Sequence, residues 1–327
     1  MLSTRLTLLL ADGSFEVAGD GTAAVVGPPV GTDLSILPKN RVEVVQRYFP
    51  DHKAFADAGF ATKVAPEGPY SLSILALPRA KHAARSLIAT LRPLTSGHLI
   101  VDGQKTDGID SLVKDLRKHA DVTEVISKAH GKLCVIEGGD FTDWVEAEME
   151  VDGFKTGPGV FSADRIDPGS AALIAALPKA LTGHVVDLGA GWGVLAHAAL
   201  ERGATSIDLV EADHVAIEAA RQNIRKPNAR FHWADARTFL PETPPKHIVC
   251  NPPFHAARAA DPTLGQAFIK NARSILTRNG TLWLVANRHL PYERTLDEAF
   301  ASVTTLVDTA GYKVIRAERP RPSPKGR

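Results

Sequence analysis

The second half of the chain alternates short apolar runs with amphipathic stretches, and glycine, proline or asparagine ends most of the runs. The amphipathic stretches, near 194–202, 215–223 and 268–276, predict helices. Strands that alternate with helices form a mostly parallel sheet covered on both faces. Two further runs flank Ala310-Gly311 and predict a terminal antiparallel hairpin. The predicted strands are 184–188, 206–211, 230–234, 247–250, 281–286, 303–308 and 312–318.

The first half also has an α/β pattern, and part of it resembles the second half. An apolar strand, a proline (Pro78), a helix, a glycine turn (Gly97) and another strand follow one another, as they do around Pro252 and Gly280. This order predicts a duplicated fold, the alternative being two unrelated α/β domains. Leu77 stands where the second half has Asn251, so we expect a first copy without chemistry. The elements predicted here are strands at 6–10, 71–77, 98–102 and 132–136 and helices near 80–91 and 109–118.

Length and composition agree with two globular domains. The 327 residues are about twice the roughly 150 expected for one domain, and 44% apolar with 23% charged residues excludes a disordered chain or a coiled coil. We place the domains at 1–140 and 141–327, with Glu137–Asp140 as the hinge and an alternating strand at 145–154 opening the second.

Charge and cysteine content restrict the partners. A net charge of +1 provides no overall field for a polyanion, so a nucleic acid has to bind at a local patch. Cys134 and Cys250 are too few for a four-cysteine zinc site, and they fit a reducing compartment. No apolar run approaches the roughly 18 residues of a membrane span. We therefore expect a cytoplasmic, monomeric protein that uses neither a membrane nor a metal.

A glycine-rich loop follows the first strand of the second half, in the segment Asp187-Leu188-Gly189-Ala190-Gly191-Trp192-Gly193. Glycines let backbone approach a ligand closely, and a helix amino end favours an anionic group. A dinucleotide fingerprint would require glycine at Val194. Asp187 at the entry would repel a pyrophosphate but can attract a cationic amino group, which favours S-adenosylmethionine over NAD.

Two acidic residues end the next strands. Glu211, at the carboxyl end of its strand, can bind both ribose hydroxyls of an adenosine. Asp235, after the third strand, can accept from the adenine amine, the alternative being a helix cap. Both side chains are expected at the sheet edge that carries the glycine loop.

The segment Asn251-Pro252-Pro253-Phe254 follows the fourth strand. An aromatic amine is a poor nucleophile because its lone pair is delocalised into the ring. Two acceptors, the Asn251 side-chain oxygen and the Pro252 carbonyl, would draw the nitrogen toward a tetrahedral geometry, and the prolines would hold them in place. Phe254 offers a flat face to a base turned out of its stack.

With these motifs the second half resembles the class I S-adenosylmethionine-dependent methyltransferases, in particular the small-domain group with two-domain bacterial rRNA guanine-N2 methyltransferases. The resemblance covers about 151–317, and the first half resembles the degenerate copy of the small-subunit enzymes more loosely. Its other motifs are Gly157–Ser162, Asp167–Ser170, Val285–Asn287, Leu290–Tyr292 and Lys313–Ala317.

The resemblance implies tandem Rossmann-like domains, each around a mostly parallel seven-stranded sheet with an antiparallel terminal hairpin. It implies methyl transfer from S-adenosylmethionine to the N2 amine of a guanine in ribosomal RNA, 16S being favoured, with free rRNA or the small ribosomal subunit as partner. The catalytic residues are then Asn251, Pro252 and Phe254; the cofactor-binding residues are Asp187, Gly189, Ala190, Gly191, Gly193, Glu211, Ala212, Asp235, Ala236 and Asn251; and the substrate-binding residues are Phe161, Pro253, Phe254, His255 and Asn287.

Two alternatives stay open. The Asn251–Phe254 segment would also fit a protein glutamine-N5 or a DNA or RNA adenine-N6 methyltransferase, although these more often carry tyrosine at the fourth position. A protein of another class, an RNA assembly factor that binds the cofactor with little turnover, would keep the same loop.

Overall fold

The computed structural model describes residues 2–11, 21–146, 149–253, 255–256, 259–260 and 262–322. The chain forms two compact units, Met1–Ala147 and Glu148–Arg327. The sequence placed this boundary between residues 140 and 141. Among the described residues, no helix combines the length and apolar character needed to cross a membrane.

The first unit is built on a seven-stranded sheet with the order β3-β2-β1-β4-β5-β7-β6. Five strands are parallel, and β7 runs antiparallel to both β5 and β6. The bounds are β1 Ala23–Val26, β2 Val42–Val45, β3 Ala61–Lys63, β4 Leu72–Ala76, β5 Leu99–Gln104, β6 Asp121–Lys128 and β7 Gly131–Glu137.

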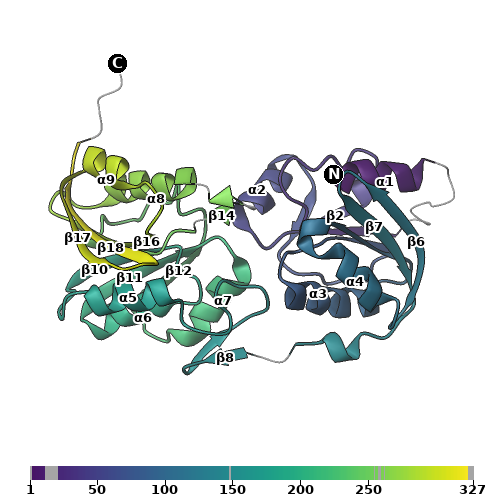
Figure 1. Ribbon diagram of the computed structural model, residues 1–327, viewed down its shortest axis with the longest axis horizontal. Coiled ribbons are helices and arrows are strands. Elements are labelled where there is room, and N and C mark those ends of the chain that lie inside the picture. The colour runs from purple at the N-terminus through teal and green to yellow at the C-terminus, as the bar shows by residue number, and fades with distance from the viewer. Residues whose placement is uncertain are drawn as a thin grey trace, which may run out of the picture. The chain divides into compact units, whose positions relative to one another are not determined.

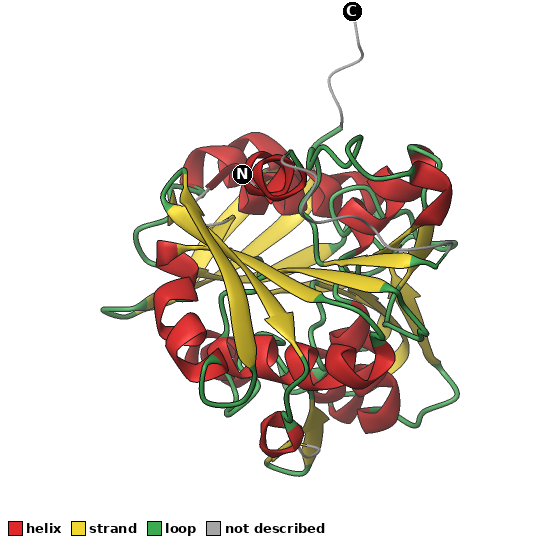
Figure 2. Ribbon diagram, turned by 90° about the vertical axis from the view of Figure 1, so that its right-hand side faces the viewer, coloured by secondary structure: helices red, strands yellow, loops and turns green. Residues whose placement is uncertain are grey.

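Helices cover both faces of this sheet (Figures 1 and 2). The apolar sides of α3 and α4 pack on one face, and those of α1 and α2 pack on the other. Figure 2 shows strands between layers of helices, as these packing contacts require. The bounds are α1 Leu2–Leu10, α2 Phe49–Asp57, α3 Lys81–Leu94 and α4 Ile109–Leu116.

The second unit repeats the plan, with the strand order β12-β11-β10-β13-β16-β18-β17. Its first five strands are parallel, and β18 runs antiparallel to β16 and β17. The bounds are β10 Gly183–Leu188, β11 Ala204–Glu211, β12 Ala229–Trp233, β13 His247–Cys250, β16 Thr281–Asn287, β17 Phe300–Asp308 and β18 Tyr312–Pro320.

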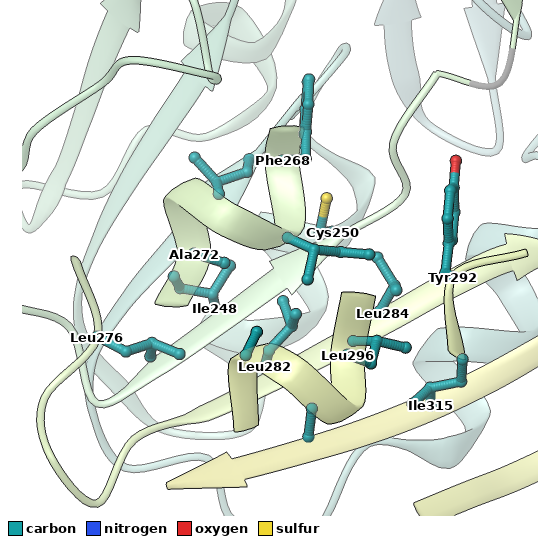
Figure 3. Packing of buried hydrophobic residues seen from close by; sticks show 14 of the residues in the cluster. Ile248, Cys250, Phe268, Ala272, Leu276, Leu282, Leu284, Tyr292, Leu296 and Ile315 are labelled. Atoms are coloured by element: carbon teal, nitrogen blue, oxygen red, sulfur yellow. The ribbon is translucent and has the colours of Figure 1, made fainter. Parts of the chain in front are cut away.

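The helices of the second unit also form two layers. One face of the sheet packs against α5, α6 and α7, and the other packs against α8 and α9. Figure 3 shows the second interface, where Phe268 and Ala272 of α8 meet Ile248 and Cys250 of β13. The bounds are α5 Pro168–Ala176, α6 Val194–Glu201, α7 His214–Asn223, α8 Pro262–Ile275 and α9 Glu293–Ala299.

Both sheets therefore have one topology. Strands β1 to β5 correspond in order to β10, β11, β12, β13 and β16, and the antiparallel pair β6–β7 corresponds to β17–β18. The prediction of tandem Rossmann-like domains with an antiparallel terminal hairpin is confirmed. The common topology also favours duplication over two unrelated folds.

Two predicted strands were wrong. The range 6–10 belongs to helix α1, because Leu2, Leu6 and Leu9 bury one helical face and Arg5, which is fully buried, pairs with Asp102 of β5. The range 145–154 does not hold one strand. Positive φ values at Asp152-Gly153 reverse the chain there, so that β8 (Met149–Val151) pairs antiparallel with β9 (Phe154–Thr156).

Candidate active site

The glycine loop leaves β10 at the carboxyl edge of the second sheet. Gly189, Gly191 and Gly193 all have positive φ, which side chains rarely tolerate. The Gly189 and Ala190 amides both donate to the Val210 carbonyl of the neighbouring strand, which holds the loop at the sheet edge. A Cβ added at Gly191 would meet no atom within 4 Å, so the backbone here faces open space. The loop can therefore accept a ligand directly against its main chain.

Glu211, the last residue of β11, organises this loop. Its Oε2 accepts from the Gly191 amide at 2.8 Å, and its Oε1 accepts from the Ala212 and Asp213 amides at 2.7 and 2.8 Å. Burial raises the pKa of Glu211, and these backbone donors oppose the shift. The carboxylate expected to hold a ribose thus also fixes the loop that would contact the rest of the cofactor.

Asp187 occupies a different environment from the one predicted. It lies in β10, is fully buried, and neither of its carboxylate oxygens has a hydrogen-bond partner among the described residues. Burial raises its pKa to about 8; the N–H dipole of Ala196 opposes this shift, and the Glu211 carboxylate adds to it. A direct contact with a methionine amino group would require rearrangement of the loop, so the cofactor role of Asp187 stays a prediction.

We expect Asp187→Asn to remove part of the pH dependence of stability. Because the pKa of Asp187 is raised in the folded chain, the folded form retains a proton that the unfolded chain releases, and this contribution to stability is lost as pH rises toward about 8. Asparagine cannot ionise. The melting temperature of the cofactor-free variant, minus that of the parent, should therefore increase between about pH 5 and about pH 9. A constant difference would mean that Asp187 titrates near its ordinary value.

Asn251 follows β13 at the same edge, beside the glycine loop. Its Nδ2 donates to Asp167 Oδ2 and to Ser170 Oγ, each at 2.9 Å. Pro252 is buried and Pro253 is exposed, whereas Phe254 lies outside the described residues. The predicted reacting amide is therefore anchored by its nitrogen to the start of α5.

A cavity lies between this amide and the glycine loop. Phe161 lines this cavity and is 57% exposed. Its carbonyl accepts a hydrogen bond from the indole of Trp192, which connects Phe161 to the glycine loop. The bulky Trp192 side chain is 5% exposed and packs on Phe154. The described lining consists of Phe161, Ser162, Asp167, Ser170, Gly189, Ala190, Gly191, Trp192, Val194, Leu195 and Asn251.

The other predicted residues lie outside this lining. The Asp235 carboxylate accepts from both the backbone and the guanidinium of Arg237, so its adenine contact stays a prediction. Ala212 and Ala236 follow β11 and β12 on the chain, and Ala236 is buried. Asn287 ends β16, where its side-chain oxygen accepts from the His289 amide. His255 belongs to the short strand β14 (His255–Ala256), which pairs with β15 (Ala259–Ala260).

These features fit S-adenosylmethionine. The open main chain at Gly191 and the strand-end carboxylate of Glu211 suit an adenosine-containing ligand. The described residues contain no group of three His, Cys, Asp or Glu side chains that could hold a metal ion. Burial, with Asp187 nearby, raises the pKa of Cys250 well above its usual range, so this thiol is not an activated nucleophile.

Sequence reasoning assigned no role to three polar residues of the cavity lining. Asp167 and Ser170 were recognised only as part of a family motif, without a role. Ser162 was treated in the same way, yet it lines the cavity with a positive φ of 51°. The signal available in the sequence was the order Asp-Pro-Gly-Ser, in which an aspartate precedes a helix-starting proline.

The corresponding edge of the first unit has different chemistry. The β1–β2 and β10–β11 registers place Gln46 where the second unit has Glu211. Gln46 donates to the Pro28 carbonyl and accepts from the Tyr48 amide, so its side chain is used within the protein. The β1–β4 and β10–β13 registers place Ala76, the residue before Leu77, where the second unit has Asn251, so the predicted match of Leu77 with Asn251 is wrong by one residue. The first copy thus has no counterpart of Glu211 or Asn251.

Comparison with known proteins identifies relatives over most of the chain. The family model described as "Methyltransferase small domain" matches residues 152–316, half of the chain. The ribosomal RNA small subunit methyltransferase C of Alteromonas mediterranea is 29% identical, with 94% of this chain and 97% of that protein covered. The ribosomal RNA large subunit methyltransferase G of Shewanella sp. (strain MR-4) is 27% identical, with 80% and 73% covered.

A solved structure has the same fold over nearly the full length. It is the 16S rRNA N2 guanine methyltransferase RsmC of T. thermophilus, in complex with AdoMet and guanosine. The TM-score is 0.80 at 25% identity, and 95% of this chain and 91% of that chain are covered. The similarity therefore includes both units.

Proposed function

The chain belongs to the methyltransferase small domain family, and from this premise we propose that it methylates the exocyclic N2 amine of a guanine in 16S ribosomal RNA, with S-adenosylmethionine as donor. The observation that carries the proposal is the full-length similarity to an enzyme whose structure holds AdoMet and guanosine, in a chain that places an anchored asparagine beside its glycine loop.

The donor supplies an electrophilic methyl group. The main chain of the glycine loop would contact S-adenosylmethionine. Glu211 would bind the ribose hydroxyls of this donor while keeping the Gly191 amide in place. These contacts fix distance and direction, which is how an enzyme accelerates an in-line displacement between bound reactants.

The target amine would be held by the segment after β13. The Asn251 side-chain oxygen and the Pro252 carbonyl accept hydrogen bonds from its two N–H groups, which localises the nitrogen lone pair and raises the nucleophilicity of the amine. Phe161, exposed at the cavity, offers an aromatic face to a base turned out of its stack. Phe254, for which the sequence predicts the same role, lies outside the described residues. The amine would take the methyl group directly, with S-adenosylhomocysteine as the leaving group and one proton lost from the methylated nitrogen, so no covalent intermediate on the protein is required.

The first unit would dock the RNA. It has a cavity beyond β4 and at the start of α3, lined in part by Leu77, Arg79 and Lys81. Two cationic side chains next to a helix amino end suit an RNA phosphate. Lys81, whose side chain is 57% exposed, also pairs with Asp115.

We further propose that the protein acts as a monomer on free rRNA or the small subunit, in the cytoplasm where this substrate is made.

Charge reversal at this cavity should separate RNA capture from cofactor binding. We expect Arg79→Glu with Lys81→Glu to weaken rRNA binding at least about tenfold and to reduce its salt dependence, because phosphate contacts are lost. Calorimetric affinity for S-adenosylmethionine should stay at the parent value. Lys53→Glu on α2, an exposed lysine paired with Asp57, is the matched control. Equal losses in both variants would place the docking surface elsewhere.

A large-subunit substrate is the second candidate, because the relatives include a large subunit methyltransferase. Incubation with methyl-labelled donor and, in parallel, free 16S rRNA, assembled small subunits, 23S rRNA, DNA or release factor tests both. The proposal expects incorporation in a 16S-containing sample. Incorporation confined to 23S rRNA, DNA or protein would replace it.

A further inference from the structure

The amide of Asn251 has a defined polarity, and the start of α5 sets it. We propose that Asp167 and Ser170 are positioning residues, which hold the Asn251 amide nitrogen so that its oxygen is directed toward the target amine. This inference rests on the proposed function, because it needs Asn251 as the acceptor. Neither residue has to touch the substrate amine in order to act.

Two hydrogen bonds from its amide nitrogen fix the orientation of the Asn251 side chain. Asn251 Nδ2 donates to Asp167 Oδ2 and to Ser170 Oγ, each at 2.9 Å, and so uses both of its N–H groups. An ionised carboxylate only accepts, so the amino end of the amide is the end that can face Asp167. Oδ1 lies on the other branch of the planar amide. The wrong orientation would set Oδ1 against the carboxylate and would present two donors to an amine that needs an acceptor.

The two acceptors are themselves held rigidly. Asp167 is the N-cap of α5, and its Oδ2 also accepts from the Ser170 amide at 2.8 Å. Both side chains are 8% exposed. Pro168 starts the helix, and Leu173 anchors it as a fully buried residue. A network whose members all have partners keeps one geometry.

Gly169 shows how closely this cluster is packed. A Cβ added there would lie 2.9 Å from Asp167 Oδ2 and 3.1 Å from the ring of Tyr312. The motif Asp-Pro-Gly-Ser therefore has a physical role at each position: an acceptor, a helix start, a residue without a side chain, and a second acceptor.

A helix cap alone would explain only part of these contacts. The cap needs the bond from the Ser170 amide to Asp167, but it does not need the Ser170 hydroxyl or any bond from Asn251. Asn251 lies 84 positions from Asp167 and 81 from Ser170 in the sequence. Capping of α5 therefore does not explain its two hydrogen bonds to these residues.

A double-mutant cycle tests the inference in the full chain. Ser170→Ala removes one acceptor and keeps the helix, and Asp167→Asn keeps a capping oxygen but loses the charge that fixes the amide polarity. We expect single-turnover methyl transfer to slow by about 3- to 10-fold for Ser170→Ala and about 10- to 100-fold for Asp167→Asn. The affinity for S-adenosylmethionine should be unchanged. Ser274→Ala on α8, which loses a bond to the Asn271 carbonyl, is the matched control.

The decisive result comes from the Asn251→Ala background. If Asp167 and Ser170 act through Asn251, neither substitution slows that variant further. Equal losses with and without Asn251, or parent rates for both single variants, would overturn the positioning role. A parent rate for Asn251→Ala alone would instead refute the proposed reacting centre. Thermal unfolding of each variant separates a folding defect from either outcome.

Discussion

Replacing Asn251 by alanine should lower the single-turnover rate of methyl transfer by about 100- to 1,000-fold, by analogy with the removal of one oxyanion-hole donor. The substitution removes one acceptor of the target amine and leaves the glycine loop and Glu211 intact. The affinity for S-adenosylmethionine should change little. Rapid-quench single-turnover measurements and calorimetry on the same preparation provide both quantities.

Asn228→Ala is a matched control for this variant. Asn228 precedes β12, at the opposite end of the strand from the site, and its Nδ2 donates to the Thr205 carbonyl. We expect the control to turn over at the parent rate. If Asn251→Ala does so too, Asn251 only ends a strand, and the amine is activated elsewhere.

The second large effect is expected at Glu211. Glu211→Ala should weaken S-adenosylmethionine binding by about 1–3 kcal/mol, roughly 5- to 150-fold, because charged hydrogen bonds are lost. The structure adds a reason to the predicted ribose contact: three backbone amides, including that of Gly191, lose their acceptor together. The affinity of Glu211→Gln for S-adenosylmethionine should lie between that of the parent and that of Glu211→Ala. The glutamine keeps one accepting oxygen, but its amide nitrogen cannot accept from these donors.

Glu218→Ala is the matched control for the cofactor experiment. Glu218 lies on α7 with its side chain 45% exposed, and it pairs with Arg221. Titration calorimetry should give the parent affinity for this variant. An unchanged affinity for Glu211→Ala would place the ribose contact at another side chain.

The second unit could be predicted well from sequence because its strands are buried runs separated by amphipathic helices and clear turns. In the first unit the sequence predicted β4, β5, β7, α3 and α4 but not β1, β2 or β3. These three strands have only four, four and three residues, too few to show a periodic pattern. Helix α1 was misread because its polar residue Arg5 is buried by a partner, Asp102, that lies 97 positions away. A contact between residues so far apart cannot be inferred from the local pattern of apolar and polar residues.

The site was predictable to the extent that its residues end neighbouring strands. That rule predicts that the glycine loop, Glu211 and Asn251 lie at one edge of the sheet, and the structure places them there. It could not reveal that Asp187 points into a fully buried environment. It also could not assign Asp167, because a helix cap and a partner of a distant amide have the same local sequence.

The central claim is methyl transfer to the N2 amine of a 16S rRNA guanine. Nucleoside analysis of unmethylated 16S rRNA, incubated with the purified protein and S-adenosylmethionine, tests it most directly. We expect the label to be recovered as N2-methylguanosine at a single position, and Asn251→Ala to abolish most of it. Recovery of the label as N6-methyladenosine, or cofactor binding without any labelled nucleoside, would refute guanine N2 methylation by this protein.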